Sequence, residues 1–287
     1  MHNSEWSLVF FTLLGQLSAG VLFSLMIFSI IGFSNKVRES QRIFKVSIYI
    51  ATILMILALI ISFLHLSSPL ASVYAFSNLK QSWLSREILL VSAFTAFLGF
   101  LSIYVYRFNT KKQITVFLLL ATIIGFLMIY SMAKIYMLPT VPAWDTPITL
   151  INFFGSGLIT GSAFFLLVYY QITGETTEKN IHAKTGKIYI TIIGIVLASR
   201  ALTIFTSCFT EIVSRSAFAP SQLLVTEFFV SWIYWLLGLG LILWQIFSPV
   251  KKIKTFLKFF YLAFICFVMA EILYRALFYS SFYRVGI

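Results

Sequence analysis

The sequence predicts an all-α membrane protein, a bundle of eight transmembrane helices with both termini on the outer (periplasmic) side. The first observation is composition: 60% of the 287 residues are hydrophobic and 10% are charged, whereas about a quarter of the residues in a soluble domain are charged. The second is that eight apolar stretches are long enough to span about 30 Å of hydrocarbon. The third is that basic residues gather in alternate loops. The remaining segments are short, so we expect a single integral membrane domain over residues 1–287.

Each predicted helix is a run of about 20 or more mainly apolar residues. Within the second run, residues 52–64 (TILMILALIISFL) are continuously apolar, which excludes the alternating segments of a membrane β-barrel. This helix ends before Pro69 because proline cannot continue it. The third helix opens at the start of the next apolar run, beside Glu87. In chain order, the predicted spans cover residues 7–32, 44–66, 86–106, 114–135, 148–171, 187–210, 223–247 and 255–279.

The 21 Lys and Arg residues predict the orientation of the bundle. Fourteen of them follow the first, third, fifth and seventh spans, and cytoplasmic loops carry such an excess of basic residues. The net charge of +12 is therefore mainly a topology signal, with affinity for anionic inner-leaflet lipid, and does not indicate nucleic-acid binding. The basic residues of these loops are Lys36, Arg38, Arg42, Lys45, Arg107, Lys111, Lys112, Lys179, Lys184, Lys187, Lys251, Lys252, Lys254 and Lys258.

An imidazole and a carboxylate flank the loop at residues 67–85, which joins the second and third spans on the predicted outer side. His65 ends the second helix and Glu87 opens the third, so both side chains can face one pocket. Imidazole titrates near neutrality and can accept a hydroxyl proton, which a nearby carboxylate relays to water. This chemistry suits oxidation of a quinol. The alternative is that His65 is an interfacial residue and that Glu87 favours the helix dipole.

Other polar residues inside the spans are further candidates, because ionisable groups are costly in a membrane. Glu271 and Arg275 stand four residues apart, a spacing that predicts an ion pair, with a supporting role at the outer pocket as the second interpretation. Gln16 is a candidate to bind a ligand or to join two helices. Gly157 and Gly161 form a G-x-x-x-G pattern, which is typical of close helix packing.

The sequence lacks the residues that several classes of cofactor require. A transmembrane haem pair requires facing histidines, but His2 lies in the N-terminal tail and His182 in a cytoplasmic loop, which leaves only His65 near a span boundary. Cys208 and Cys266 cannot hold an iron–sulfur cluster, which needs about four thiolates. We expect no haem, cluster or other metal in this chain, and no Walker motif indicates use of ATP. Metal centres for any electron transfer then belong to a partner.

Five stretches together resemble the DMSO reductase anchor subunit family, the DmsC-type membrane anchors of molybdenum oxidoreductases. The resemblance implies an inner-membrane subunit of anaerobic electron transport that binds menaquinol near the outer face and oxidises it. It also implies two outer-side partners: an iron–sulfur subunit that receives the electrons, and a molybdopterin subunit that reduces an S- or N-oxide. The stretches are FFTLLGQLSAG at 10–20, LHLSSP at 64–69, SWLSREI at 82–88, LPTVPAW at 138–144 and AEILYRALFY at 270–279.

The resemblance also implies roles for individual residues. The quinol-site histidine and glutamate of the family correspond to His65 and Glu87, the expected catalytic residues. Arg86 and Arg275 stand in matching motifs, and Gln16 and Glu271 join them as candidate quinol-binding residues. Two alternatives stay open: a structural anchor without a quinol site, and a secondary transporter. The transporter is disfavoured because no pair of Gly- or Pro-broken helices is present.

Overall fold

The computed structural model describes residues 3–31, 37–63, 78–107, 111–173, 179–214, 222–247 and 253–280, and these ranges contain helices and short turns but no strand. Eight helices are long and apolar enough to cross a membrane, which confirms the predicted all-α architecture. The helices are α1 (Asn3–Ile31), α2 (Val37–Phe63), α3 (Trp83–Arg107), α4 (Lys111–Tyr136), α5 (Pro147–Thr173), α6 (Lys179–Ser214), α7 (Gln222–Phe247) and α8 (Ile253–Ser280).

Two helices begin well before the predicted spans. Helix α2 starts at Val37 instead of residue 44, and α6 starts at Lys179 instead of residue 187. Both extra segments are polar, with the sequences VRESQRI and KNIHAKTG. Hydropathy detects only the part of a helix that lies in hydrocarbon, whereas a helix can continue beyond it into the polar region.

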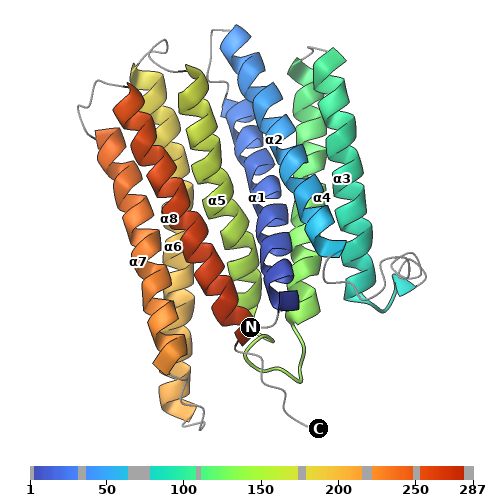
Figure 1. Ribbon diagram of the computed structural model, residues 1–287, viewed down its shortest axis with the longest axis vertical. Helices are drawn as coiled ribbons and strands as arrows, with labels where there is room; N and C mark the ends of the chain where they lie inside the picture. Colours follow the sequence, from blue (N-terminus) through green and yellow to red (C-terminus); the bar gives the residue numbers. More distant parts are fainter. Residues whose placement is uncertain are drawn as a thin grey trace.

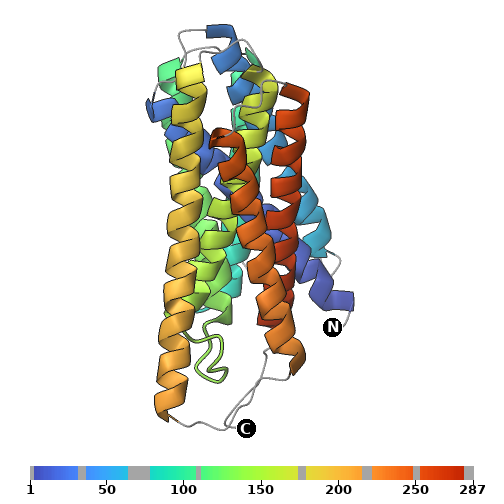
Figure 2. The same ribbon diagram turned by 90° about the vertical axis from the view of Figure 1, so that its left-hand side faces the viewer.

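The helices form two groups that meet at the middle of the bundle. Helices α1–α4 lie on one side and α5–α8 on the other, with α1 and α5 side by side between them (Figure 1; Figure 2 gives the view turned by 90°). The start of α1 and the end of α8 lie at the same end of the bundle, together with the start of α3 and the end of α4 (Figure 1). We call this the terminal end. That it faces the periplasm remains a prediction.

Glycines bring α1 and α5 into direct backbone contact. A Cβ atom on Gly20 would lie 1.9 Å from the carbonyl oxygen of Gly157, and one on Gly161 would lie 2.2 Å from the carbonyl carbon of Gly20. No side chain larger than hydrogen fits at this crossing. The predicted close packing at the G-x-x-x-G pattern is therefore confirmed, and its partner is Gly20 of α1.

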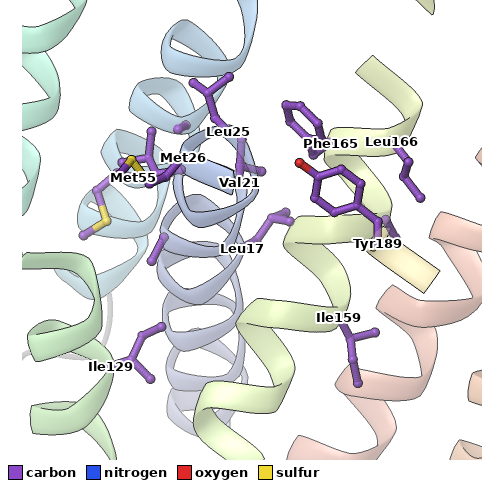
Figure 3. Packing of buried hydrophobic residues seen from close by; sticks show 14 of the residues in the cluster. Leu17, Val21, Leu25, Met26, Met55, Ile129, Ile159, Phe165, Leu166 and Tyr189 are labelled. Atoms are coloured by element: carbon purple, nitrogen blue, oxygen red, sulfur yellow. The ribbon is translucent and has the colours of Figure 1, made fainter. Parts of the chain in front are cut away.

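Apolar side chains of several helices fill the space around this crossing. The buried core is continuous from α1 to its neighbours on both sides, and Figure 3 shows its central part. The Tyr189 hydroxyl of α6 donates a hydrogen bond to the Ser24 carbonyl of α1 over 2.6 Å. Labelled members of the core are Leu17, Val21, Leu25, Met26, Met55, Ile129, Ile159, Phe165 and Leu166.

Candidate functional site

A series of interacting polar side chains crosses the interior of the bundle, and we call it the polar chain. Every helix except α2 contributes at least one member. Groups of this kind are costly in hydrocarbon and usually mark a functional site. The members, each buried or half-buried, are Thr12, Gln16, Glu87, Tyr136, Asn152, Arg200, Trp235, Glu271, Tyr274, Arg275 and Tyr279.

Glu87 lies at one end of the polar chain, on the second turn of α3. Ser82 caps this helix by accepting a hydrogen bond from the Ser85 amide at 3.3 Å. Glu87 shares the buried face of α3 and is 8% exposed. Among the described residues, no hydrogen bond or ion pair reaches its carboxylate, while the hydroxyls of Tyr136 and Tyr279 lie within electrostatic range. A buried carboxyl group thus lies within electrostatic range of two phenols.

These two phenols form a hydrogen-bonded pair at the terminal end. The Tyr279 hydroxyl donates to the Tyr136 hydroxyl over 3.0 Å, and Thr12 of α1 lies beside Tyr279. The segment between α4 and α5 covers the pair through Trp144. Its indole N–H donates to the Phe278 carbonyl over 2.8 Å, and its ring stacks on that of Phe278 with centroids 5.1 Å apart. The tyrosines are therefore held between three helices under an aromatic cover.

Arg275 occupies the next turn of α8 inward from Tyr279. Its guanidinium donates to the Gln16 side-chain oxygen over 2.8 Å and lies 3.9 Å from the centroid of the Phe153 ring. Gln16 is fully buried, and its amide nitrogen has no hydrogen-bond partner among the described residues. Gln16 therefore joins two helices and keeps the two N–H donors of its amide available for a polar ligand.

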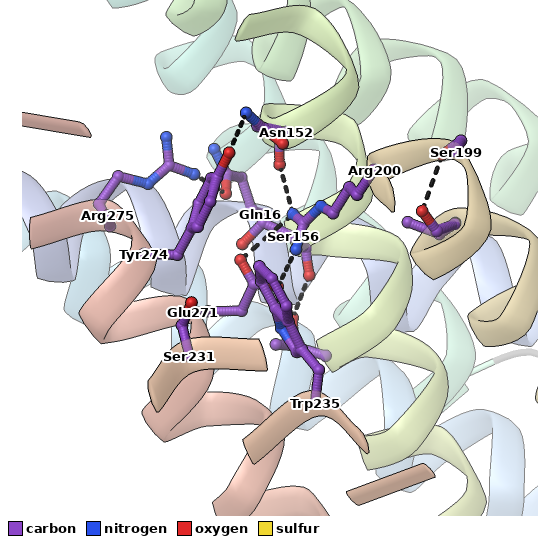
Figure 4. Close-up of polar contacts among 12 residues, drawn as sticks. Gln16, Asn152, Ser156, Ser199, Arg200, Ser231, Trp235, Glu271, Tyr274 and Arg275 are labelled. Atoms are coloured by element: carbon purple, nitrogen blue, oxygen red, sulfur yellow. Dashed lines mark hydrogen bonds and ion pairs between the residues drawn. The ribbon is translucent and has the colours of Figure 1, made fainter. Parts of the chain in front are cut away.

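Arg200 and Glu271 form a buried ion pair at the other end of the polar chain (Figure 4). The two guanidinium nitrogens of Arg200 lie 2.5 and 3.3 Å from the two carboxylate oxygens. Trp235 donates to the same carboxylate over 3.0 Å, and Arg200 also donates to the Asn152 carbonyl over 2.8 Å. Glu271 is thus paired with Arg200, and the predicted pairing with Arg275 is wrong. The Glu271 side chain points toward α6 and α7 instead of along its own helix.

Asn152 and Tyr274 connect the two ends. The Asn152 amide nitrogen donates to the Tyr274 hydroxyl over 2.8 Å, and the side-chain oxygen of Asn152 has no partner among the described residues. The Oγ of Ser156, one turn further along α5, and the Nε of Arg200 are also unpartnered there. Buried polar atoms normally make hydrogen bonds, so this region has unused capacity to bind a polar group.

Four of the six residues predicted for the site belong to the polar chain: Gln16, Glu87, Glu271 and Arg275. His65 lies outside the described residues, so its approach to Glu87 stays a prediction.

Arg86 has a different set of contacts. Its guanidinium donates to the carbonyls of Leu79 and Lys80 over 2.9 and 2.7 Å, and it lies 4.1 Å from the centroid of the Trp83 ring. These contacts fasten the end of the preceding loop to the start of α3. A role for Arg86 in quinol binding remains a prediction without a contact to the polar chain among the described residues.

Several members of the polar chain were not predicted from the sequence. Arg200 carried a usable signal, because it is a charge inside the predicted span 187–210, where charges are costly. Asn152 carried the same signal as Gln16, a polar amide inside a predicted span, whereas Tyr136 and Tyr279 carried none, since tyrosine is common in membrane helices. Among the described residues, no group of three or more His, Cys, Asp or Glu side chains is placed to hold a metal ion.

The stretches that carry the family resemblance converge in space. Residues 10–20 supply Thr12 and Gln16, residues 82–88 supply Glu87, and residues 270–279 supply four members from α8. Residues 138–144 supply the Trp144 cover, and residues 64–69 lie outside the described part of the chain. A model of the DMSO reductase anchor subunit family (DmsC) matches residues 1–281. The chain belongs to this family.

Individual anchor subunits are similar to this one over much of its length. Anaerobic dimethyl sulfoxide reductase chain YnfH of Escherichia coli (strain K12) is 31% identical over 60% of this chain and 61% of its own. The subunit designated C in the same organism's anaerobic dimethyl sulfoxide reductase is 24% identical over 98% of this chain and 96% of its own. The subunit of the same designation from Haemophilus influenzae is 23% identical over 55% and 56%.

Membership in this family confirms several predictions. The protein is a multi-pass inner-membrane protein and an anchor subunit of the DMSO reductase type, a component of anaerobic electron transport. An anchor subunit implies partner subunits, a catalytic one and an iron–sulfur one.

Proposed function

We propose that this anchor subunit binds a quinol, specifically menaquinol, at the Glu87 end of the polar chain and oxidises it. The electrons pass to an iron–sulfur partner subunit and from there to a molybdopterin subunit that reduces an S- or N-oxide. The observation that carries the proposal is the buried Glu87 carboxyl group, which has no partner among the described residues and lies within electrostatic range of a pair of hydrogen-bonded phenols.

Oxidation of a quinol releases two electrons and two protons, so the site must accept both protons. A carboxylate positioned against a quinol hydroxyl is a suitable general base, and Glu87 fills this role in the proposal. His65, predicted at the end of the second span, is the second proton acceptor. Arg275 and the free amide N–H of Gln16 supply donors that orient the quinone oxygen.

The proposed reaction takes place at the outer face of the membrane. The concentration of basic residues in the loops at the opposite end from Asn3 supports this orientation. Glu87 lies near the start of α3, at the terminal end. Electrons and protons would then leave on the same side, and the subunit itself would move no net charge across the membrane. The iron–sulfur partner would dock at the terminal end.

Substitution of Glu87 by Gln in the assembled complex tests the proposal. General-base catalysis contributes about 10²- to 10⁴-fold, so we expect quinol-driven reduction of the S- or N-oxide to fall at least about 100-fold. Turnover driven by a soluble dye that reduces the partner subunits directly should not change, because it bypasses the anchor. Glu39→Gln, in the first turn of α2, is the matched control and should leave both activities intact.

The same experiment separates the alternatives. Wild-type quinol turnover in Glu87→Gln would remove this carboxylate from the reaction. If instead the wild-type complex shows no quinol-driven turnover and binds no quinol analogue, the subunit is a structural anchor without a quinol site.

A further inference from the structure

An apolar crevice with a volume of about 170 Å³ lies between α1 and α8, with Thr160 of α5 also lining it. Phe10 at its rim is 42% exposed, so the crevice borders the lipid-facing surface. The α1 residues repeat at intervals of three and four, which places them on one helix face. The apolar walls are made of Phe10, Leu13, Leu14, Leu17, Val268 and Ile272.

The crevice and the quinol end of the polar chain share one face of α8. Val268 and Ile272 line the crevice, and Arg275 and Tyr279 follow at spacings of three and four residues. Residues with these spacings lie one above another on a helix. This face of α8 therefore runs, turn by turn, from the crevice to the proposed binding site for the quinol ring.

The crevice wall carries one charged residue, and that charge is neutralised. Glu271 lines the crevice, but its two carboxylate oxygens are held by Arg200 and one of them also by Trp235. A carboxylate with its partners in place does not require water or a cation from the crevice. The space is thus suited to hydrocarbon.

We propose that this crevice holds the ring-proximal part of the isoprenoid tail of the quinol. This inference rests on the proposed function, because it assigns the tail of the same substrate. A dry cavity of about 150 Å³ lined by Leu, Ile and Phe binds benzene, so the crevice accommodates a branched isoprene unit. From Phe10 to Leu17 the crevice extends along α1 by about 10 Å, at 1.5 Å per residue. The rest of the tail leaves the crevice into the bilayer.

Two crevice-filling variants test the inference in the complete complex: Leu14→Phe on α1 and Val268→Phe on α8. Leu262→Phe is the matched control, because Leu262 is a lipid-facing residue of α8 that is 48% exposed and does not line the crevice. Each variant is assayed with menaquinol carrying its full tail, and with reduced menadione, which has the same ring system but no isoprenoid tail.

We expect both crevice variants to raise the KM for full-length menaquinol about tenfold. This factor corresponds to about 1.4 kcal/mol of binding free energy, which is about the contribution of two buried methylene groups. The kcat/KM for reduced menadione should not change, and this also shows that the variants fold and assemble. The control should behave as wild type with both quinols.

Three outcomes would overturn the inference. An unchanged KM for both quinols in both variants would show that the tail lies elsewhere. Loss of phospholipid from the purified variants, with both KM values unchanged, would assign the crevice to an acyl chain. Equal loss with both quinols would place the effect on the ring site. Absence of quinol turnover in the wild type would instead contradict the proposed function itself.

Discussion

The contact between α1 and α5 makes a sharp prediction for Gly20→Ala. The added Cβ would lie 1.9 Å from the Gly157 carbonyl oxygen, whereas ordinary contacts begin at 3.4 Å. The two helix backbones must therefore separate by about 1.5 Å, because the Gly157 carbonyl is part of one backbone and the new Cβ is bonded directly to the other. Overpacking costs about 1–3 kcal/mol, and we place this substitution at the upper end.

Helix propensity partly offsets that cost. Alanine is favoured over glycine in a helix interior by about 1 kcal/mol, which leaves a net destabilisation of about 2 kcal/mol for Gly20→Ala. Gly99→Ala in α3 is the matched control, because a Cβ there would meet no atom within 4 Å. It should be stabilising by up to about 1 kcal/mol.

The measurement is the fraction of each detergent-solubilised variant that remains monodisperse by size-exclusion chromatography after heating over a series of temperatures. Gly20→Ala should aggregate at a clearly lower temperature than wild type, and Gly99→Ala at an equal or higher one. The same midpoint for the two variants would refute the reasoning, since it would mean that α1 and α5 do not touch through their backbones.

Two further predictions concern bonds across the bundle. Arg200→Met leaves the Glu271 carboxylate buried without its cation and should lower the stability by about 3–5 kcal/mol. The double variant Arg200→Met/Glu271→Met should lose less stability than Arg200→Met alone. Equal losses in the two variants would show that Arg200 and Glu271 do not act as a pair. Trp144→Phe removes the indole hydrogen bond to the Phe278 carbonyl and should cost about 1 kcal/mol in the same heating assay, whereas an unchanged midpoint would show that this bond contributes nothing.

Hydropathy was sufficient to predict the helices, because the bilayer fixes the length of a span. The number of helices and most of their boundaries agree with the structure. The starts of α2 and α6 were missed since their polar first turns carry no apolar signal. The contact between Gly20 and the G-x-x-x-G pattern shows the limit of a local motif: Gly157 and Gly161 predicted a close crossing but did not specify the partner helix.

Four members of the candidate site were predicted from the sequence, but their hydrogen-bond and ion-pair partners were not. Gln16, Glu87, Glu271 and Arg275 were recognisable because each is a polar residue in or beside an apolar run. Their partners come from other helices and are remote in sequence, so spacing along one helix could not identify them. Arg200 was accessible to the same rule about charges in spans.

Glu271 pairs with Arg200 instead of Arg275, and this changes which charged groups are available at the quinol end of the polar chain. Because Arg200 neutralises Glu271, Arg275 is free to donate to Gln16 and remains a cation within electrostatic range of Tyr279. With Glu87 ionised, the polar chain holds two carboxylates and two guanidinium groups. In the proposed reaction, deprotonation of a quinol hydroxyl beside Arg275 would place the new negative charge next to a guanidinium whose hydrogen bond goes to the neutral side chain of Gln16. A fixed cation placed where negative charge develops favours that deprotonation.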